Sequence, residues 1–201
     1  MQPFNFRPAT GPWSTGEARL AVCIVPDLTR DRGLGVLVRD CREAMAPFPI
    51  TTVPDELLRV TLAQVNDAPA GQIDDAGRKA LLEGLREHLA PIPPVTVTAG
   101  SPLAYATGAL CDLEVEPLAA LGSAVRAAVA AVRGAEAGHP GIEHMTLGYA
   151  YAEASTDELA RTLRRVRPSH ARLTVDAVRL IEVTAGERAF AWTTVGEVSL
   201  P

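Results

Sequence analysis

The chain has 201 residues, enough for one domain or for two small lobes that share a core, and 47% of them are hydrophobic. Its formal net charge of -5 argues against a broad nucleic-acid surface, which would be basic, but is compatible with a small basic pocket. Three cysteines without a CxxC pair indicate a reducing compartment. Because the sequence shows no signal-peptide pattern and no apolar run long enough to span a membrane, we expect a cytoplasmic protein with no membrane partner.

The first half of the chain predicts alternating strands and helices after an irregular start. Residues 1–16 are rich in Pro, Gly and Thr, which is typical of a tail or an edge segment. Asp74 or Asp75 is in position to cap a helix. The hydrophobic spacing predicts a strand, a helix, a second strand and a second helix, over residues 19–25, 29–46, 57–65 and 74–90.

The second half predicts more strands than helices. One helix is expected over residues 117–132, and another begins after Ser155 or Thr156 and ends before Pro168. Strands are expected over residues 94–97, 109–115 and 142–151, and as a terminal hairpin over 172–183 and 188–198. Residues 99–105 are interpreted as a turn plus a short strand.

The strand near residues 142–151 organises the interpretation of the sequence. Its central stretch, residues 143–149, reads EHMTLGY. Because side chains alternate between the two faces of a strand, His144, Thr146 and Gly148 are expected to share one face. The apolar residues between them are expected to face the core.

An earlier strand repeats this pattern with one change. Residues 58–64 read LRVTLAQ, so Arg59, Thr61 and Ala63 are expected on one face. A basic residue, a threonine and a small residue therefore occur at the same spacing in both strands. We interpret the two polar faces as opposite sides of a cleft that binds a phosphate.

Both basic residues also have ordinary structural interpretations. His144 could be a buried histidine bonded to a backbone carbonyl, and Arg59 could be a surface residue of an edge strand. The matching threonines and small residues favour a site over both. His139 is either a solvent-exposed loop residue or a substitute proton carrier.

Several aromatic residues are candidates to stack on a base: Tyr105, Tyr149, Tyr151 and Trp192. By strand alternation, Tyr149 and Tyr151 are expected to point away from His144 into the core. Tyr105 is therefore the better candidate for the cleft.

The order of elements and the weak repeat predict an α+β fold. We expect a bilobal, pseudo-symmetric duplication in which two antiparallel sheets face a central cleft and helices lie on the outside. The motif at residues 144–147, with its earlier echo, resembles the H-x-[ST]-x signature of the two-histidine (2H) phosphoesterases. This superfamily includes the bacterial 2′-5′ RNA ligase-like proteins and the cyclic nucleotide phosphodiesterases. The resemblance extends over nearly the whole chain and implies one domain, residues 1–201, of two intertwined lobes.

The resemblance also implies roles for individual residues. His144 would take a histidine's role as general base or general acid, and Thr146 and Thr61 would hydrogen-bond the phosphate oxygens. Two further substrate-binding candidates come from their own chemistry and not from the resemblance: Arg59 can bind an anion and Tyr105 can stack on a base. The implied chemistry needs no metal and no cofactor. The implied partner is a small phosphorylated or nucleotide-like ligand, including RNA ends, and nothing in the sequence indicates an oligomeric state.

Arg59 departs from the family pattern, because it stands where the first motif has its histidine. Arginine stays protonated and has no acceptor lone pair, so it cannot act as a general base, although it binds phosphate or carboxylate through paired hydrogen bonds. Three hypotheses remain open. The protein is a phosphodiesterase-type hydrolase with an altered site, a binding protein without turnover, or a scaffold used for other acid-base chemistry in a biosynthetic pathway.

Overall fold

The structure is a computed structural model that describes residues 1–11, 13–138 and 141–201. Strands and α-helices alternate along it with three short 3-10 helices at Asp55–Leu57, Ala70–Gln72 and Glu116–Leu118. The main elements are β1 (Arg19–Ile24), α1 (Arg32–Met45), β2 (Ile50–Thr52), β3 (Val60–Gln64), α2 (Asp75–Leu89), β4 (Val95–Tyr105), β5 (Gly108–Leu113), α3 (Ala119–Arg133), β6 (His144–Ala150), α4 (Thr156–Leu163), β7 (His170–Val175), β8 (Ala177–Ala185) and β9 (Phe190–Ser199). The predicted mixture of helices and strands is confirmed.

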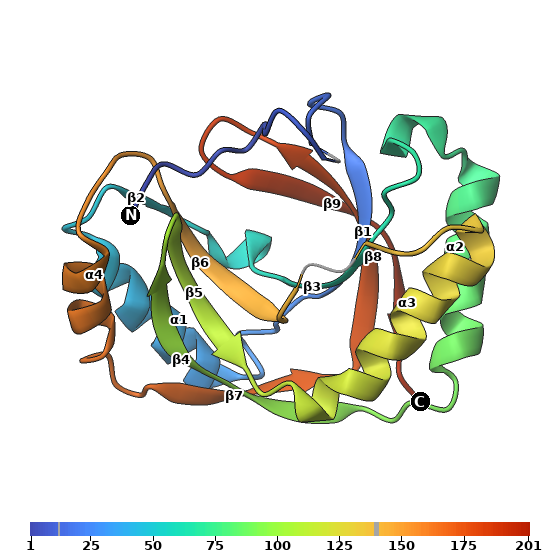
Figure 1. Cartoon of the computed structure of the whole chain (residues 1–201). Coiled ribbons are helices and arrows are strands. Elements are labelled where there is room, and N and C mark those ends of the chain that lie inside the picture. The colour runs from blue at the N-terminus through green and yellow to red at the C-terminus, as the bar shows by residue number, and fades with distance from the viewer. Residues whose placement is uncertain (12, 139–140) are drawn as a thin grey trace.

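The strands of the described residues form one curled antiparallel sheet in the order β7-β4-β5-β6-β3-β1-β8-β9, with β2 paired to β6. Its two halves curve toward one another (Figure 1). One half contains β2, β4, β5, β6 and β7, and the other contains β1, β3, β8 and β9. The halves join where Val60 of β3 pairs with Met145 of β6. The two predicted sheets are thus two halves of one sheet.

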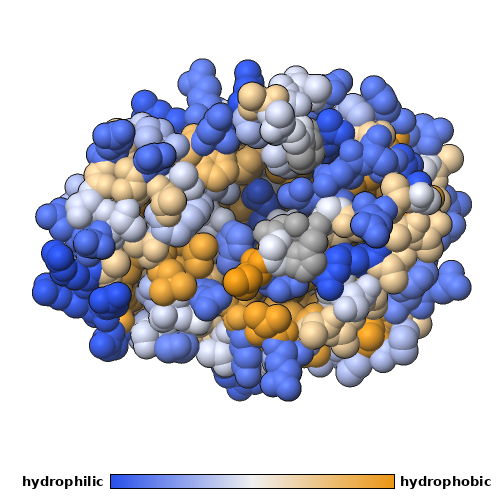
Figure 2. Space-filling model, viewed as in Figure 1, coloured by the Kyte–Doolittle hydropathy of each residue, from blue (hydrophilic) through white to orange (hydrophobic). Residues whose placement is uncertain are grey.

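The helices lie on the outer faces of the two halves. Helices α1 and α4 cover the half that contains β6, whereas α2 and α3 lie side by side over the other half (Figure 1). The predicted caps are confirmed for two of them, since Asp74 Oδ1 accepts a hydrogen bond from Gly77 N at 2.8 Å and Ser155 Oγ accepts one from Glu158 N at 3.2 Å. Seen from the same side, hydrophilic residues dominate the outline of the molecule (Figure 2).

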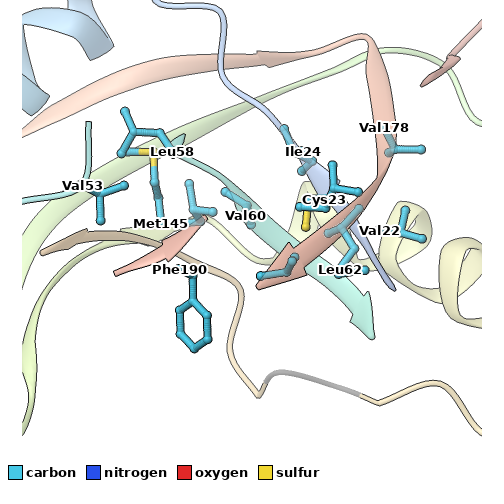
Figure 3. Packing of buried hydrophobic residues seen from close by; sticks show 14 of the residues in the cluster. Val22, Cys23, Ile24, Val53, Leu58, Val60, Leu62, Met145, Val178 and Phe190 are labelled. Carbon is cyan, nitrogen blue, oxygen red and sulfur yellow. The ribbon is translucent and has the colours of Figure 1, made fainter. Parts of the chain in front are cut away.

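The apolar core lies between the sheet and these helices. Strand β1 is buried over its whole length, as its continuous apolar sequence predicts, because β3 and β8 flank it. Figure 3 shows Val22 and Ile24 of β1 close to Val60 and Leu62 of β3. The three cysteines are buried free thiols. Val60 and Met145, which join the two halves, are both fully buried.

Two predicted boundaries are wrong. Gly100, Ser101 and Pro102 suggest a turn, but β4 continues through them with a shift of register between Ala99 and Pro102. The predicted strand 172–183 is two strands separated at Asp176. Strand β7 pairs with β4 in one half of the sheet and β8 pairs with β1 in the other, so the chain changes halves at this residue.

Among the described residues, no helix combines the length and the apolar character needed to cross a membrane.

Candidate functional site

The two motif strands meet at the pair Val60–Met145, and this contact sets the geometry of the site. Both side chains are buried in the core, so the residues on either side of them point to the opposite face of the sheet. Continuing the antiparallel register by one residue in each direction puts Arg59 across from Thr146 and Thr61 across from His144. Each basic residue therefore lies beside the threonine of the other motif.

A pocket with a volume of about 280 Å³ opens on this face. All five residues that the sequence selects line it, and they come from both halves of the sheet: Arg59, Thr61, Tyr105, His144 and Thr146. Apolar walls are supplied by Val53, Leu57 and several aromatic rings. No Asp or Glu side chain of the described residues lines the pocket, so Arg59 gives it a positive character.

A bulge follows the threonine in β6. Thr146 pairs with Leu110 of β5 and Gly148 pairs with Ala109, so Leu147 is an extra residue in the ladder. The extra residue reverses the alternation of side chains beyond it. Tyr149 consequently lies on the same face as Thr146 and lines the pocket.

Strand β3 has the equivalent bulge. Thr61 pairs with Cys23 of β1 and Ala63 pairs with Val22, which leaves Leu62 as the extra residue. Gln64 therefore points into the pocket from the first motif, as Tyr149 does from the second. The repeat seen in the sequence extends to a repeated bulge.

These bulges, together with the end of β6 at Ala150, overturn four predictions based on strict alternation. Ala63 is fully buried and does not line the pocket, so it lies on the core side and not on the face of Thr61. Tyr149 is buried, as expected, but it shares the pocket with His144 and does not point away from it. Gly148 lies on the core side, where a Cβ would meet Ile50 and Met45, and not on the face of His144. Tyr151 is 47% exposed and does not lie in the core.

The bulge in β6 depends on the absence of a side chain at position 148. A Cβ there would lie 2.5 Å from Ile50 Cγ2 and 3.1 Å from the Thr51 carbonyl oxygen. We expect Gly148→Ala to lower the free energy of unfolding by about 1–3 kcal/mol through overpacking, measured by chemical denaturation. Gly71→Ala is the control, because a Cβ there meets nothing within 4 Å. Equal stability of the two variants would contradict this packing.

One ring nitrogen of His144 is fixed by the backbone. Its Nδ1 lies 2.8 Å from the Ile142 carbonyl oxygen. Because a carbonyl oxygen can only accept, Nδ1 carries a hydrogen, and in the neutral ring Nε2 keeps its lone pair. This arrangement allows Nε2 to accept a proton from a ligand or from water.

Arg59 lies over an aromatic ring at the wall of the pocket. Its guanidinium carbon lies 5.6 Å from the centroid of the Phe190 ring. Figure 3 shows Phe190 pointing away from the other labelled core side chains. Phe190 also lines the pocket, so the ring supports the cation at its wall.

Thr61 is oriented by the residue opposite it in β1. The Cys23 thiol donates to Thr61 Oγ1 at 3.6 Å. Burial raises the pKa of Cys23 to about 11, which outweighs the lowering effects of Arg59 and of the hydrogen bond with Thr61, so the thiol keeps its proton. The Thr61 hydroxyl accepts from this thiol and can donate its own hydrogen to an anion in the pocket.

The N-terminal segment forms another wall, which the sequence does not reveal. Gln2 N donates to the Ala106 carbonyl oxygen at 2.7 Å and Phe4 N donates to the Ala150 carbonyl oxygen at 2.8 Å. The segment predicted as a tail or edge is thus attached to one half of the sheet. It brings Phe4, Asn5, Pro8 and Trp13 to the pocket.

The remaining candidates lie elsewhere. Trp192 Nε1 donates to the Leu57 carbonyl oxygen at 3.1 Å, and its ring does not line the pocket. His139 lies outside the described residues. Tyr105 lines the pocket, and its pKa is raised by burial despite a hydrogen bond with Thr107. Within the described part of the chain, no three His, Cys, Asp or Glu side chains gather closely enough to hold a metal ion.

Solved structures with the same fold are known from two bacteria. TT0787 of Thermus thermophilus is 18% identical, with a TM-score of 0.65, over 90% of this chain and 97% of that one. E. coli LigT complexed with 3'-AMP is 16% identical, with a TM-score of 0.63, over 92% of this chain and 98% of that one. No curated protein sequence matches.

This curled sheet, with its two matched strands meeting in one pocket, is the fold of the LigT-like phosphoesterases. The sequence profile of the 2'-5' RNA ligase superfamily matches residues 40–187, a range that includes both motif strands. The chain belongs to the 2'-5' RNA ligase superfamily.

Proposed function

We propose that this protein hydrolyses a nucleotide-type phosphodiester or cyclic phosphate in the pocket between the two halves of its sheet. The observation that carries the proposal is the convergence of Arg59, Thr61, His144 and Thr146, two from each half, on one pocket. A cation and two hydroxyls suit the oxygens of a phosphate, and a histidine beside them suits proton transfer.

The ligands of LigT support a nucleotide-like substrate. That protein has been crystallised with 3'-AMP, ATP, NADP+ and phosphate. The pocket of about 280 Å³ lies near the lower end of the range for small-molecule sites, and its aromatic walls suit stacking with a base. RNA ends fall within the same chemistry.

In this proposal Arg59 replaces the histidine of the first motif. It holds two phosphate oxygens through its paired N–H groups, and its charge stabilises the additional negative charge of the transition state. Thr61 and Thr146 donate to the phosphate oxygens. Tyr105 lies at the pocket wall, where it contacts the rest of the ligand.

His144 provides acid-base catalysis. With Nδ1 bonded to the Ile142 carbonyl oxygen, Nε2 of the neutral ring accepts the proton of an attacking water. Arg59 cannot share this task, because a guanidinium carries no lone pair that accepts a proton.

The test is turnover by the wild-type protein. We expect it to convert 2′,3′-cyclic nucleotides into nucleoside monophosphates both with and without EDTA. Anion-exchange chromatography measures the product. Binding of the monophosphate products is measured separately by calorimetry. Absence of product would contradict the proposed hydrolysis, and absence of binding as well would remove the nucleotide site altogether.

A second candidate is a binding protein without turnover. Arg59 is the observation that favours it, because arginine keeps the affinity for an anion and removes one proton carrier. Calorimetric binding of the nucleotides without product would select this candidate over the enzyme.

We further propose that residues 1–201 form one domain that works in the cytoplasm. One pocket shared by both halves of the sheet supports the first part. Three buried free cysteines support the second.

A further inference from the structure

Tyr149 is a phenol held rigidly in the wall of the pocket. Its side chain is only 6% exposed, and the bulge in β6 turns it toward the same space as His144. The ring packs edge-on against those of Phe4, Phe6 and Phe190, with centroid distances of 4.8, 5.0 and 5.9 Å. Three rings therefore fix the direction of its hydroxyl group.

The Tyr149 hydroxyl interacts with both motifs. Burial raises its pKa, while the charge of Arg59 and hydrogen bonds with the Thr146 and Arg59 side chains lower it. Because burial has the larger effect, the phenol is protonated at neutral pH. The positive charge of Arg59 is in place to stabilise the phenolate that forms when this proton leaves.

The pocket offers few other groups that carry a transferable proton. Among its described lining residues these are His144, Tyr105 and Tyr149, apart from the permanently charged Arg59 and the threonine hydroxyls. Tyr105 forms its hydrogen bond with Thr107, in the β4–β5 turn. Of these two phenols, Tyr149 is the one that hydrogen-bonds to the motif residues Arg59 and Thr146.

We propose that Tyr149 is the second proton carrier of the site, the general acid that protonates the leaving oxygen of the phosphodiester. This inference rests on the proposed hydrolytic function. It assigns Tyr149 to the proton-transfer step that has no residue because Arg59 replaces the histidine of the first motif. Arg59 then has two tasks, since it binds the phosphate and lowers the energy of the Tyr149 phenolate.

The proposed step balances in atoms and charge. The water oxygen forms a bond to phosphorus while His144 Nε2 takes a water proton. The bond between phosphorus and the ribose oxygen breaks, its electron pair goes to that oxygen, and the oxygen takes the Tyr149 proton. The imidazolium then returns a proton to the phenolate through solvent, so that one water has been added to the ester. A phenol is more acidic than a ribose hydroxyl, which favours this transfer.

The test compares two leaving groups in Tyr149→Phe, a change that keeps the ring and its packing. A 2′,3′-cyclic nucleotide has an alkoxide leaving group, which needs a proton, whereas a p-nitrophenyl phosphodiester has a stable phenolate, which does not. We expect kcat to fall about 100-fold or more for the cyclic nucleotide and by less than about 10-fold for the p-nitrophenyl ester. Affinity for the monophosphate product should stay within about 3-fold of wild type, since its phosphate contacts remain.

Tyr151→Phe is the matched control, because Tyr151 is a phenol of the same chain segment that does not line the pocket. It should leave both rates unchanged. Equal losses on both esters in Tyr149→Phe, or no loss on either, would overturn the role of Tyr149 and leave the proposed function standing. A wild-type protein inactive on both esters would overturn the proposed function itself, and the role of Tyr149 with it.

Discussion

His144→Ala is expected to lower the turnover of 2′,3′-cyclic nucleotides by about 100- to 10,000-fold, the range typical of a lost general base or acid. The reason is the fixed ring, which lines the pocket and whose Nδ1 is bonded to the Ile142 carbonyl oxygen, so that Nε2 of the neutral ring keeps its lone pair. Binding should change little, since Arg59 and the two threonines remain. Steady-state kinetics and calorimetry of the monophosphate measure the two effects separately.

His88→Ala is a close control for this variant. His88 lies in α2 and does not line the pocket, yet its Nδ1 also contacts a backbone carbonyl oxygen, that of Gly84, at 2.9 Å. Its removal should leave turnover unchanged. If His144→Ala retained the rate of His88→Ala, His144 would not be the proton acceptor.

Arg59→Ala is expected to weaken the binding of monophosphate nucleotides by about 10- to 100-fold, which corresponds to the loss of one charged hydrogen-bonded contact. Arg59 is the positively charged side chain of the described pocket lining, and no carboxylate there competes for it. Arg59→Lys keeps the charge but loses the paired N–H groups, so its affinity should fall between those of wild type and alanine. Calorimetry at constant ionic strength measures all three proteins.

Arg188→Ala is the matched control for Arg59. Its guanidinium carbon lies 4.8 Å from the centroid of the Tyr151 ring, so it also makes a cation–π contact, but it does not line the pocket. We expect its affinity to equal that of wild type. An Arg59→Ala protein that bound the nucleotide as tightly as Arg188→Ala would remove Arg59 from the phosphate site.

The sequence predicts the placement of the polar residues that precede each bulge. Arg59 and Thr61, like His144 and Thr146, are two residues apart, so alternation correctly assigns each pair to one face. Their apolar neighbours Val60 and Met145 are correctly assigned to the core. Short spacing along one strand is the information that a single sequence carries best.

The residues after each threonine could not be predicted by the same rule. Alternation assumes an uninterrupted ladder, and the extra residues Leu62 and Leu147 break it. The feature of the sequence that indicates the two bulges is the small residue after each Thr-Leu pair, Ala63 in one strand and Gly148 in the other. A small residue at the same place in both copies indicates that another part of the chain approaches the backbone closely there. It says less about which face of the sheet the residue occupies.

Long-range contacts account for the other gaps. Phe4 and Trp13 reach the pocket because the N-terminal segment hydrogen-bonds to Ala106 and Ala150, more than one hundred residues away in the sequence. The change of halves at Asp176 likewise depends on pairing with β4 and β1. Neither contact leaves a periodic pattern in the segment that makes it.

The central claim is that the two halves of the sheet hold one phosphate together. A crystal structure with a bound nucleoside 3′-monophosphate tests it most directly. We predict a single phosphate within hydrogen-bonding distance of the Arg59 guanidinium, the Thr61 and Thr146 hydroxyls and His144 Nε2. A phosphate that contacts residues of only one half, or that binds outside this pocket, would contradict the account.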